Sequence, residues 1–195
     1  EMNYRAIIKY VGNVLQIEAL FMIPAIIVCL IYKEPATLHA YAASAVITLA
    51  VGTLLSFSKF SGNIYAKEGF VTVSLSWIMI SLFGALPFII SGAIPNFVDA
   101  WFETVSGFTT TGSSILKDVE ALSHGNLYWR SFTHWLGGMG VLVFLLAVIP
   151  LSNKSGETLH ILRAESPGPS VGKLTPTIRK TSQYLYLIYI VLTLI

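Results

Sequence analysis

The residues of this sequence best suited to bind a ligand form a short oxygen-rich run, Thr109-Thr110-Thr111-Gly112-Ser113. A potassium ion gives up its hydration shell only where oxygens replace the water, as rings of backbone carbonyls do in potassium-selective filters. Threonine hydroxyls add a further layer of oxygens. Gly112 can adopt a positive φ at little steric cost, so its carbonyl can point the same way as its neighbours'. The run therefore predicts an ion-binding segment, with potassium at Thr110, Thr111 and Gly112.

The run follows an apolar, aromatic segment, 95–107, that is too short to cross a membrane. A spanning helix needs about 20 mostly apolar residues, whereas runs of about 10 to 14 are typical of re-entrant segments. Pro95, Asn96 and Asp99 are residue types that begin helices. The β-branched and glycine cluster after Ser106 disfavours continuation of the helix. We expect a half-membrane helix, followed by an extended strand that returns to the surface.

A threonine-rich run with one glycine is also common in ordinary loops, so the elements around it decide between the two interpretations. Of the 195 residues, 54% are hydrophobic and 11% are charged. Soluble domains carry about 25% charged residues, so lipid or further protein must cover this chain. Irregular backbone is tolerated at membrane depth only where protein buries it or water lines it. The net charge of +2, without an arginine-rich stretch, argues against nucleic acid as a partner.

The chain contains several apolar runs of membrane-spanning length, which predict an all-α membrane protein, a transmembrane helix bundle with a re-entrant pore loop. The candidate spans are 4–32, 38–57, 70–91 and 127–150, and a fifth begins near residue 182. The predicted organisation is two N-terminal transmembrane helices (1–60), a helix–pore-loop–helix repeat (67–151), a cytoplasmic linker (152–180) and the start of a second, truncated repeat (181–195).

The distribution of basic residues predicts the orientation, because cytoplasmic segments of membrane proteins are enriched in Lys and Arg. With a cytoplasmic N-terminus, nine of the 12 basic residues lie inside and three lie outside. The inner ones are Arg5, Lys9, Lys59, Lys67, Lys154, Arg163, Lys173, Arg179 and Lys180, and the outer ones are Lys33, Lys117 and Arg130. The half-helix and the oxygen-rich run therefore enter the membrane from outside.

Several segments resemble the Trk/Ktr/HKT superfamily of potassium transporters, and most closely its bacterial TrkH/TrkG type. Residues 102–113 resemble the first pore loop, 130–140 the inner-helix motif that follows it, and 67–70 with 84–88 the outer helix of the same repeat. Two further helices before the repeat match the bacterial type. Residues 173–176 and the apolar run after them resemble the start of the second repeat.

This resemblance implies four helix–pore-loop–helix repeats around one pore, with this chain supplying one quarter of the selectivity filter. Gly112 is then the filter glycine of the first repeat, in a segment formed by Thr109, Thr110, Thr111, Gly112 and Ser113. The resemblance also implies K⁺ as the transported ion without an organic cofactor, a homodimer of the full-length protein, and cytosolic nucleotide-binding regulatory subunits of the TrkA/KtrA type. The implied location is the bacterial cytoplasmic membrane, and the chain is expected to be part of a longer polypeptide.

Other polar residues allow two interpretations each. Glu18, in the middle of the first span, marks a functional site or forms a packing hydrogen bond with Gln16, Asn13 or a neighbour. Asp99 and Glu103 concentrate cations at the entrance, or Asp99 offsets the helix dipole while Glu103 braces the filter from behind. We favour the structural interpretation in each case.

Glycines and aromatic residues near the pore loop also allow structural roles. Gly137, Gly138 and Gly140 provide a gating hinge or, as we favour, allow helices to approach closely. Tyr128 and Trp129 fit an interfacial aromatic belt. The four histidines, His39, His124, His134 and His160, lack metal-ligand spacing.

Three function classes compete. Potassium uptake through a channel-like pore is favoured, and a membrane-embedded scaffold without transport activity is the alternative. An intramembrane enzyme would need a paired nucleophile and base, and the spans contain none that we recognise, so we predict that the protein is not an enzyme.

Overall fold

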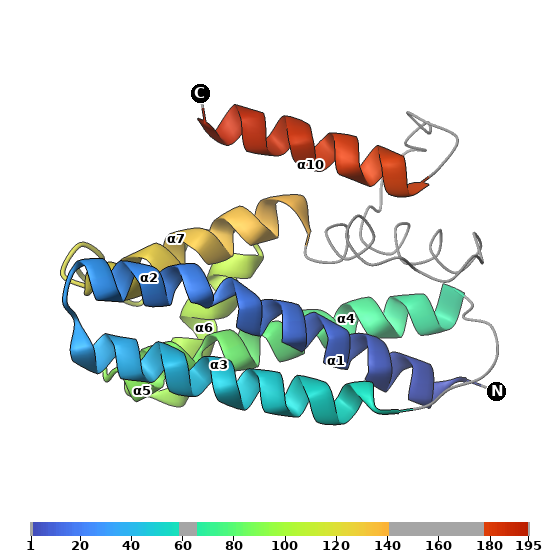
Figure 1. Cartoon of the computed structure of the whole chain (residues 1–195), viewed down its shortest axis with the longest axis horizontal. Coiled ribbons are helices and arrows are strands. Elements are labelled where there is room, and N and C mark those ends of the chain that lie inside the picture. The colour runs from blue at the N-terminus through green and yellow to red at the C-terminus, as the bar shows by residue number, and fades with distance from the viewer. Residues whose placement is uncertain (1, 59–65, 141–177, 195) are drawn as a thin grey trace.

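The computed structural model describes residues 2–58, 66–140 and 178–194, and these residues form helices without a β-strand. Figure 1 shows the first helices lying side by side along the long axis. Three helical stretches are long and apolar enough to cross a membrane, namely Tyr4–Ile31, Pro35–Ser56 and Lys67–Ile90. The predicted class, an all-α membrane protein, is therefore confirmed.

The first of these stretches consists of two helices, α1 (Tyr4–Phe21) and α2 (Ile23–Ile31), which meet at Met22. The cause is Pro24, which has no N–H to donate to the carbonyl four residues earlier. Asn3 caps α1, where its side chain accepts a hydrogen bond from the Ala6 N–H. The sequence predicts the length of this span correctly but not its interruption.

The second stretch is α3 (Pro35–Ser56), which begins with a proline at its first position, where the missing N–H costs nothing. It packs antiparallel to α1 at a close approach of two glycines. A β-carbon on Gly12 would lie 2.7 Å from the Gly52 carbonyl oxygen, so neither position has room for a side chain. Hydrogen bonds from Gln16 to Thr53 and from Ser56 to Asn13 join the two helices on either side of this contact.

The third stretch consists of α4 (Ala66–Gly84) and α5 (Leu86–Ile90), with Pro87 at the start of α5. The chain then turns back into α6 (Phe97–Phe108), and later into α7 (His124–Met139) and α10 (Ile178–Leu194). The fourth predicted span is described only to residue 140, and most of the predicted linker lies outside the described residues. The boundaries predicted for the repeats stay predictions.

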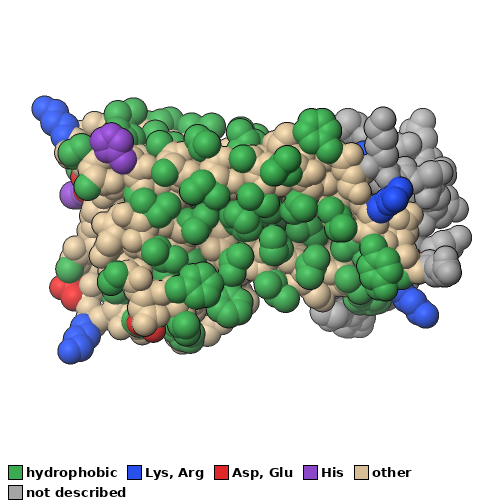
Figure 2. Space-filling model, turned by 90° about the horizontal axis from the view of Figure 1, so that it is seen from below, with side chains coloured by type: hydrophobic (Ala, Val, Ile, Leu, Met, Phe, Trp, Pro, Cys, Tyr) green, Lys and Arg blue, Asp and Glu red, His purple; other side chains and the backbone are tan. Residues whose placement is uncertain are grey.

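Contacts between distant segments define two ends of the bundle. At one end, the Asn3 N–H donates to Glu68 at the start of α4, over 3.2 Å. At the other end, Glu34 in the α2–α3 turn meets His124 at the start of α7. Figure 2 shows hydrophobic side chains over the middle of one face and charged side chains toward its two ends. This distribution is the one that a membrane-spanning bundle requires.

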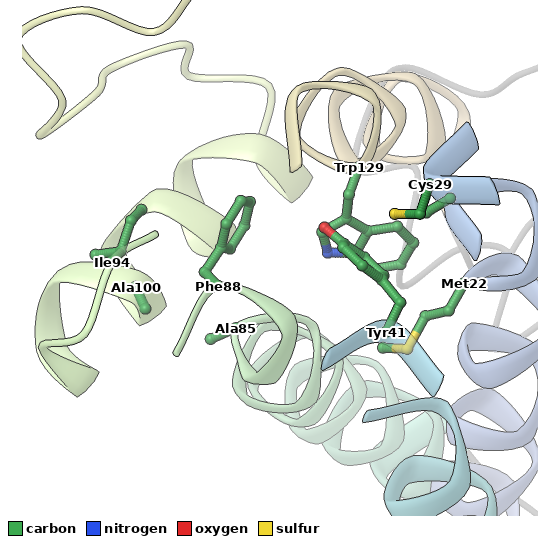
Figure 3. Close-up of a cluster of buried hydrophobic side chains, with 9 residues drawn as sticks. Met22, Cys29, Tyr41, Ala85, Phe88, Ile94, Ala100 and Trp129 are labelled. Carbon is green, nitrogen blue, oxygen red and sulfur yellow. The ribbon is translucent and has the colours of Figure 1, made fainter. Parts of the chain in front are cut away.

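A buried cluster at the second end of the bundle holds α2, α3, α5, α6 and α7 together (Figure 3). Trp129 lies at its centre, fully buried, with its ring edge-on to Tyr41 at a centroid distance of 6.2 Å. Its indole N–H donates to the Gly84 carbonyl over 2.9 Å. The prediction that Trp129 belongs to an interfacial belt is wrong, because α7 packs against α2 and α6 and its Trp129 ring is fully buried in this cluster. The half-buried Tyr128 stacks on Phe132 instead.

Candidate functional site

The half-helix predicted before the oxygen-rich run is α6, whose twelve residues begin as expected from local signals. The Asn96 side chain accepts hydrogen bonds from the N–H groups of Val98 and Asp99, at 2.9 and 3.4 Å. Asp99 lies in the first turn, where its charge is favourable to the helix dipole. The structural interpretation of Asp99 agrees with this position.

The end of α6 is a Schellman motif built with an unusual residue. The Thr110 N–H donates to the Gly107 carbonyl and the Thr111 N–H to the Ser106 carbonyl, at 2.9 and 3.0 Å. This pattern places Thr110 in the left-handed position that is usually glycine, and its φ is 56°. A β-branched residue there costs about 1–2 kcal/mol, and such strain is typical of functional sites. The prediction of an extended strand directly after the helix is therefore wrong, because a tight turn comes first.

Two positions with positive φ, Thr110 at 56° and Gly112 at 78°, flank Thr111, whose φ is not positive. In an extended strand successive carbonyls point to opposite sides, whereas alternation in the sign of φ turns neighbouring peptide groups to the same side. The positive φ predicted for Gly112 is confirmed. The structure adds the second positive φ at Thr110, which the sequence did not indicate.

The carbonyl oxygens at the two ends of the oxygen-rich run accept hydrogen bonds, and the carbonyl oxygens in its middle do not. The Thr109 carbonyl accepts from the Thr110 hydroxyl at 2.7 Å, and the Ser113 carbonyl accepts from the Ser106 hydroxyl at 2.6 Å. Within the described part of the chain, no hydrogen bond reaches the carbonyl oxygens of Thr110, Thr111 and Gly112. All five residues of the run are exposed. Its three unpartnered carbonyls are those of the predicted potassium ligands.

Glu103 braces the run from behind, as the favoured interpretation of this residue predicted. Its carboxylate is buried and accepts hydrogen bonds from the Ser114 hydroxyl at 2.9 and 3.0 Å and from the Ile115 N–H at 3.0 Å. Arg130 on α7 donates its Nε–H to the same carboxylate over 2.6 Å. The ion pair ties the oxygen-rich run, α6 and α7 together. The distribution of basic residues places Arg130 only in an outer segment, and nothing in its spacing from Glu103 predicts the pair.

Glycines allow α6 and α7 to approach closely. A β-carbon on Gly107 would overlap Thr133, and one on Gly137 would overlap the backbone of Phe108. Gly138 packs in the same way against the Tyr189 hydroxyl of α10, which donates to the Trp135 carbonyl over 2.9 Å. The packing interpretation of Gly137 and Gly138 is confirmed. Gly140 has a φ of 68° and directly follows α7.

A second polar cluster joins the α2–α3 turn to the start of α7. Glu34 accepts hydrogen bonds from the N–H groups of His124 and Gly125, at 2.8 and 3.1 Å, and from the His124 ring over 2.9 Å. Partial burial acts to raise the pKa of Glu34, but the hydrogen bonds from Gly125 and His124 outweigh it and hold this pKa below its ordinary value. Tyr32 stacks on the His124 ring. Glu34 thus caps α7 from a distant segment.

Glu18 is placed differently from its prediction. Its side chain is buried, but neither carboxylate oxygen has a hydrogen-bond partner among the described residues. The proposed partners are engaged elsewhere, Gln16 with Thr53 and Asn13 with Ser56. The predicted packing hydrogen bond is therefore wrong. The described residues contain no group of three potential metal-binding side chains, and His160 lies outside them.

Residues 37–195 match the family model described as TrkH, cation transport protein. The chain belongs to the TrkH family. It is 39% identical to the Trk system potassium uptake protein TrkH of Escherichia coli (strain K12), over 98% of this chain and 40% of the relative. It is 33% identical to TrkH of Vibrio parahaemolyticus, over 99% and 40%, and 35% identical to TrkG of Escherichia coli (strain K12), over 96% and 39%.

Membership of the TrkH family confirms the resemblance noted in the sequence, and this family is described as cation transport proteins rather than enzymes. The chain spans about two fifths of the length of these relatives. Residues 102–113, which resemble a pore loop, lie in α6 and the oxygen-rich run.

Proposed function

We propose that this chain contributes to potassium uptake by forming one quarter of a selectivity filter in a channel-like pore. The observation that carries the proposal is the set of three unpartnered, exposed carbonyls at Thr110, Thr111 and Gly112. A backbone carbonyl left without a hydrogen bond is costly unless water or a ligand satisfies it. A potassium ion that has lost its water is stabilised by this type of oxygen.

The surroundings of the run support the same proposal. At its outer end the Ser113 carbonyl accepts from the Ser106 hydroxyl, and the following Ser114 hydroxyl and Ile115 N–H donate to Glu103. The cap of α6 fixes its inner end. A segment held at both ends keeps its carbonyls in place when an ion arrives, which reduces the cost of ordering them. The C-terminal end of the α6 dipole lies beside the run and adds a favourable negative potential.

A complete carbonyl cage must surround the ion, and one run supplies one wall of it. The remaining walls are proposed to come from further repeats in the full-length protein. Following the family resemblance, we also propose a homodimer, a cytosolic nucleotide-binding regulatory subunit, and a location in the bacterial cytoplasmic membrane with the N-terminus inside. K⁺ is the transported ion in this proposal.

The test exploits two glycines with nearly the same backbone conformation. Gly112 in the run and Gly92 after α5 have φ values of 78° and 74°, and a β-carbon at either would meet no atom within 4 Å. Substitution by serine therefore imposes the same type of backbone strain, about 1–2 kcal/mol. Only Gly112 lies in the proposed filter, so Gly92→Ser is a matched control for Gly112→Ser.

Uptake of rubidium and of sodium is measured for the full-length protein in a bacterium that lacks its own potassium uptake systems. Gly112→Ser is expected to lower the preference for rubidium over sodium at least tenfold, while Gly92→Ser keeps the wild-type preference. An unchanged preference in Gly112→Ser would place this residue outside the filter. Absence of uptake by the wild-type protein would favour the alternative, a membrane-embedded scaffold.

A further inference from the structure

Glu18 of α1 lies beside Gly84, the last residue of α4, against which α6 also packs. A β-carbon on Gly84 would lie 3.0 Å from Glu18 Oε1, 2.9 Å from the Thr104 methyl group and 3.1 Å from the Phe108 ring. The carboxyl group and α6 therefore both pack against Gly84, at the junction of α4 and α5. Thr104 and Phe108 are themselves buried, so this contact lies on the face of α6 that packs against the bundle.

The surroundings of Glu18 offer no group that stabilises a negative charge. Its side chain is 3% exposed, and neither oxygen has a hydrogen-bond partner among the described residues. The helices around it carry the following other titratable or charged residues: Tyr4, Arg5, Lys9 and Tyr10 on α1, Cys29 on α2, His39 and Tyr41 on α3, Lys67 and Glu68 on α4, Asp99 and Glu103 on α6, and His124, Tyr128, Arg130 and His134 on α7.

None of these residues forms a hydrogen bond or ion pair with Glu18. Arg130 pairs with Glu103, the Tyr41 hydroxyl donates to Asn126, and Glu68 accepts from the Asn3 N–H. A buried, unpaired carboxylate is so costly that the group takes up a proton instead. Because the carboxyl oxygens have no exposed area, there is no space for a bulky ligand beside them. A proton needs no additional space.

We propose that Glu18 is a proton-binding site at the back of the pore-loop helix, neutral when α6 is seated as the structure describes. Loss of the proton creates a charge that must gain water or a cation. Glu18 Oε1, Thr104 and Phe108 all lie beside Gly84, so water that enters to solvate the charge loosens the packing of α6 at this position. Because the oxygen-rich run begins directly after Phe108, proton release at Glu18 displaces the run.

Infrared spectroscopy of the purified full-length protein tests the protonation directly. The carbonyl stretching band of a protonated carboxylic acid is expected at neutral pH and is expected to disappear in Glu18→Gln. Glu68→Gln removes another buried carboxyl group, one that has a hydrogen-bond partner, and is the control that keeps the band. A wild-type spectrum without the band at neutral pH overturns the proposal even if Glu18→Gln fails to fold, and so does a band that persists in Glu18→Gln.

The effect on the run is tested by rubidium uptake at rising pH, an experiment that rests on the proposed function. Wild-type uptake is expected to fall severalfold as the pH rises. Glutamine mimics the neutral acid, so Glu18→Gln is expected to retain uptake at neutral pH and to show no such loss at alkaline pH. Equal alkaline inhibition of both proteins refutes the coupling between Glu18 and the run. If wild-type uptake is absent, the proposed function fails, while the infrared result still decides whether Glu18 is protonated.

Discussion

Replacement of Arg130 by methionine is expected to release the oxygen-rich run from the rest of the fold. The change removes the partner of the Glu103 carboxylate, whose Oε1 lies 2.6 Å from Arg130 Nε. Methionine preserves much of the side-chain length and leaves the stem packed. The charge on Glu103, whose side chain has no exposed area in the ion pair, then stays buried without compensation.

Removal of one member of a buried ion pair costs about 3–5 kcal/mol, because the remaining charge stays desolvated. The Ser114 hydroxyl and the Ile115 N–H still donate to Glu103 and reduce this cost, so the lower limit of about 3 kcal/mol is expected. The double variant Glu103→Gln/Arg130→Met removes the charge, and the amide oxygen of glutamine still accepts from one of the donors. Its expected cost is about 1–2 kcal/mol, the value of an imperfectly satisfied buried hydrogen bond.

The assay is denaturant unfolding of the purified full-length protein in detergent, together with rubidium uptake in cells. Arg130→Met is expected to lose both stability and uptake, and the double variant is expected to be more stable than Arg130→Met alone. Ser131→Ala, at the next and exposed position of α7, is the control for substitution on this helix. A loss below about 1 kcal/mol in Arg130→Met, or a double variant less stable than the single one, would refute the bracing role of this ion pair.

Two further predictions concern the ends of the bundle. The pKa of Glu34 is held below its ordinary value of 4.5, so its contribution is complete above pH 4.5 and is lost as the pH falls through the lowered pKa. Glu34→Gln should lose about 0.5–2 kcal/mol near neutral pH, the value of a helix cap, and a difference from wild type that does not shrink in acid would contradict this. For the orientation, single cysteines at the exposed Lys67 and Lys117, in a Cys29→Ser background, should react with an impermeant thiol reagent from the inside and the outside, respectively. Reaction of both from one side would exclude the proposed topology.

Residues close together in the sequence determined much of this protein by themselves. The apolar runs set the membrane-length stretches because a helix that crosses lipid must satisfy its backbone internally and face hydrocarbon along its length. Asn96 began α6 through a hydrogen bond to the third residue along the chain, which is a purely local interaction. The positive φ of Gly112 was predictable for the same reason, because glycine lacks the β-carbon that makes this conformation costly.

Packing between distant segments decided which side chains pair with each other and which are buried. Glu103 pairs with a residue 27 positions away, and Glu34 caps a helix that begins 90 positions later. No periodicity or local motif encodes such partners. Trp129 had the residue type of a membrane interface, but the fold enclosed it beside Tyr41. Thr110 took a conformation that its own side chain disfavours, and the hydrogen bonds that end α6 hold it there. Glu18 lacks its expected partners because Gln16 and Asn13 form hydrogen bonds with α3 instead, and only this tertiary arrangement leaves its carboxyl group without a partner beside Gly84.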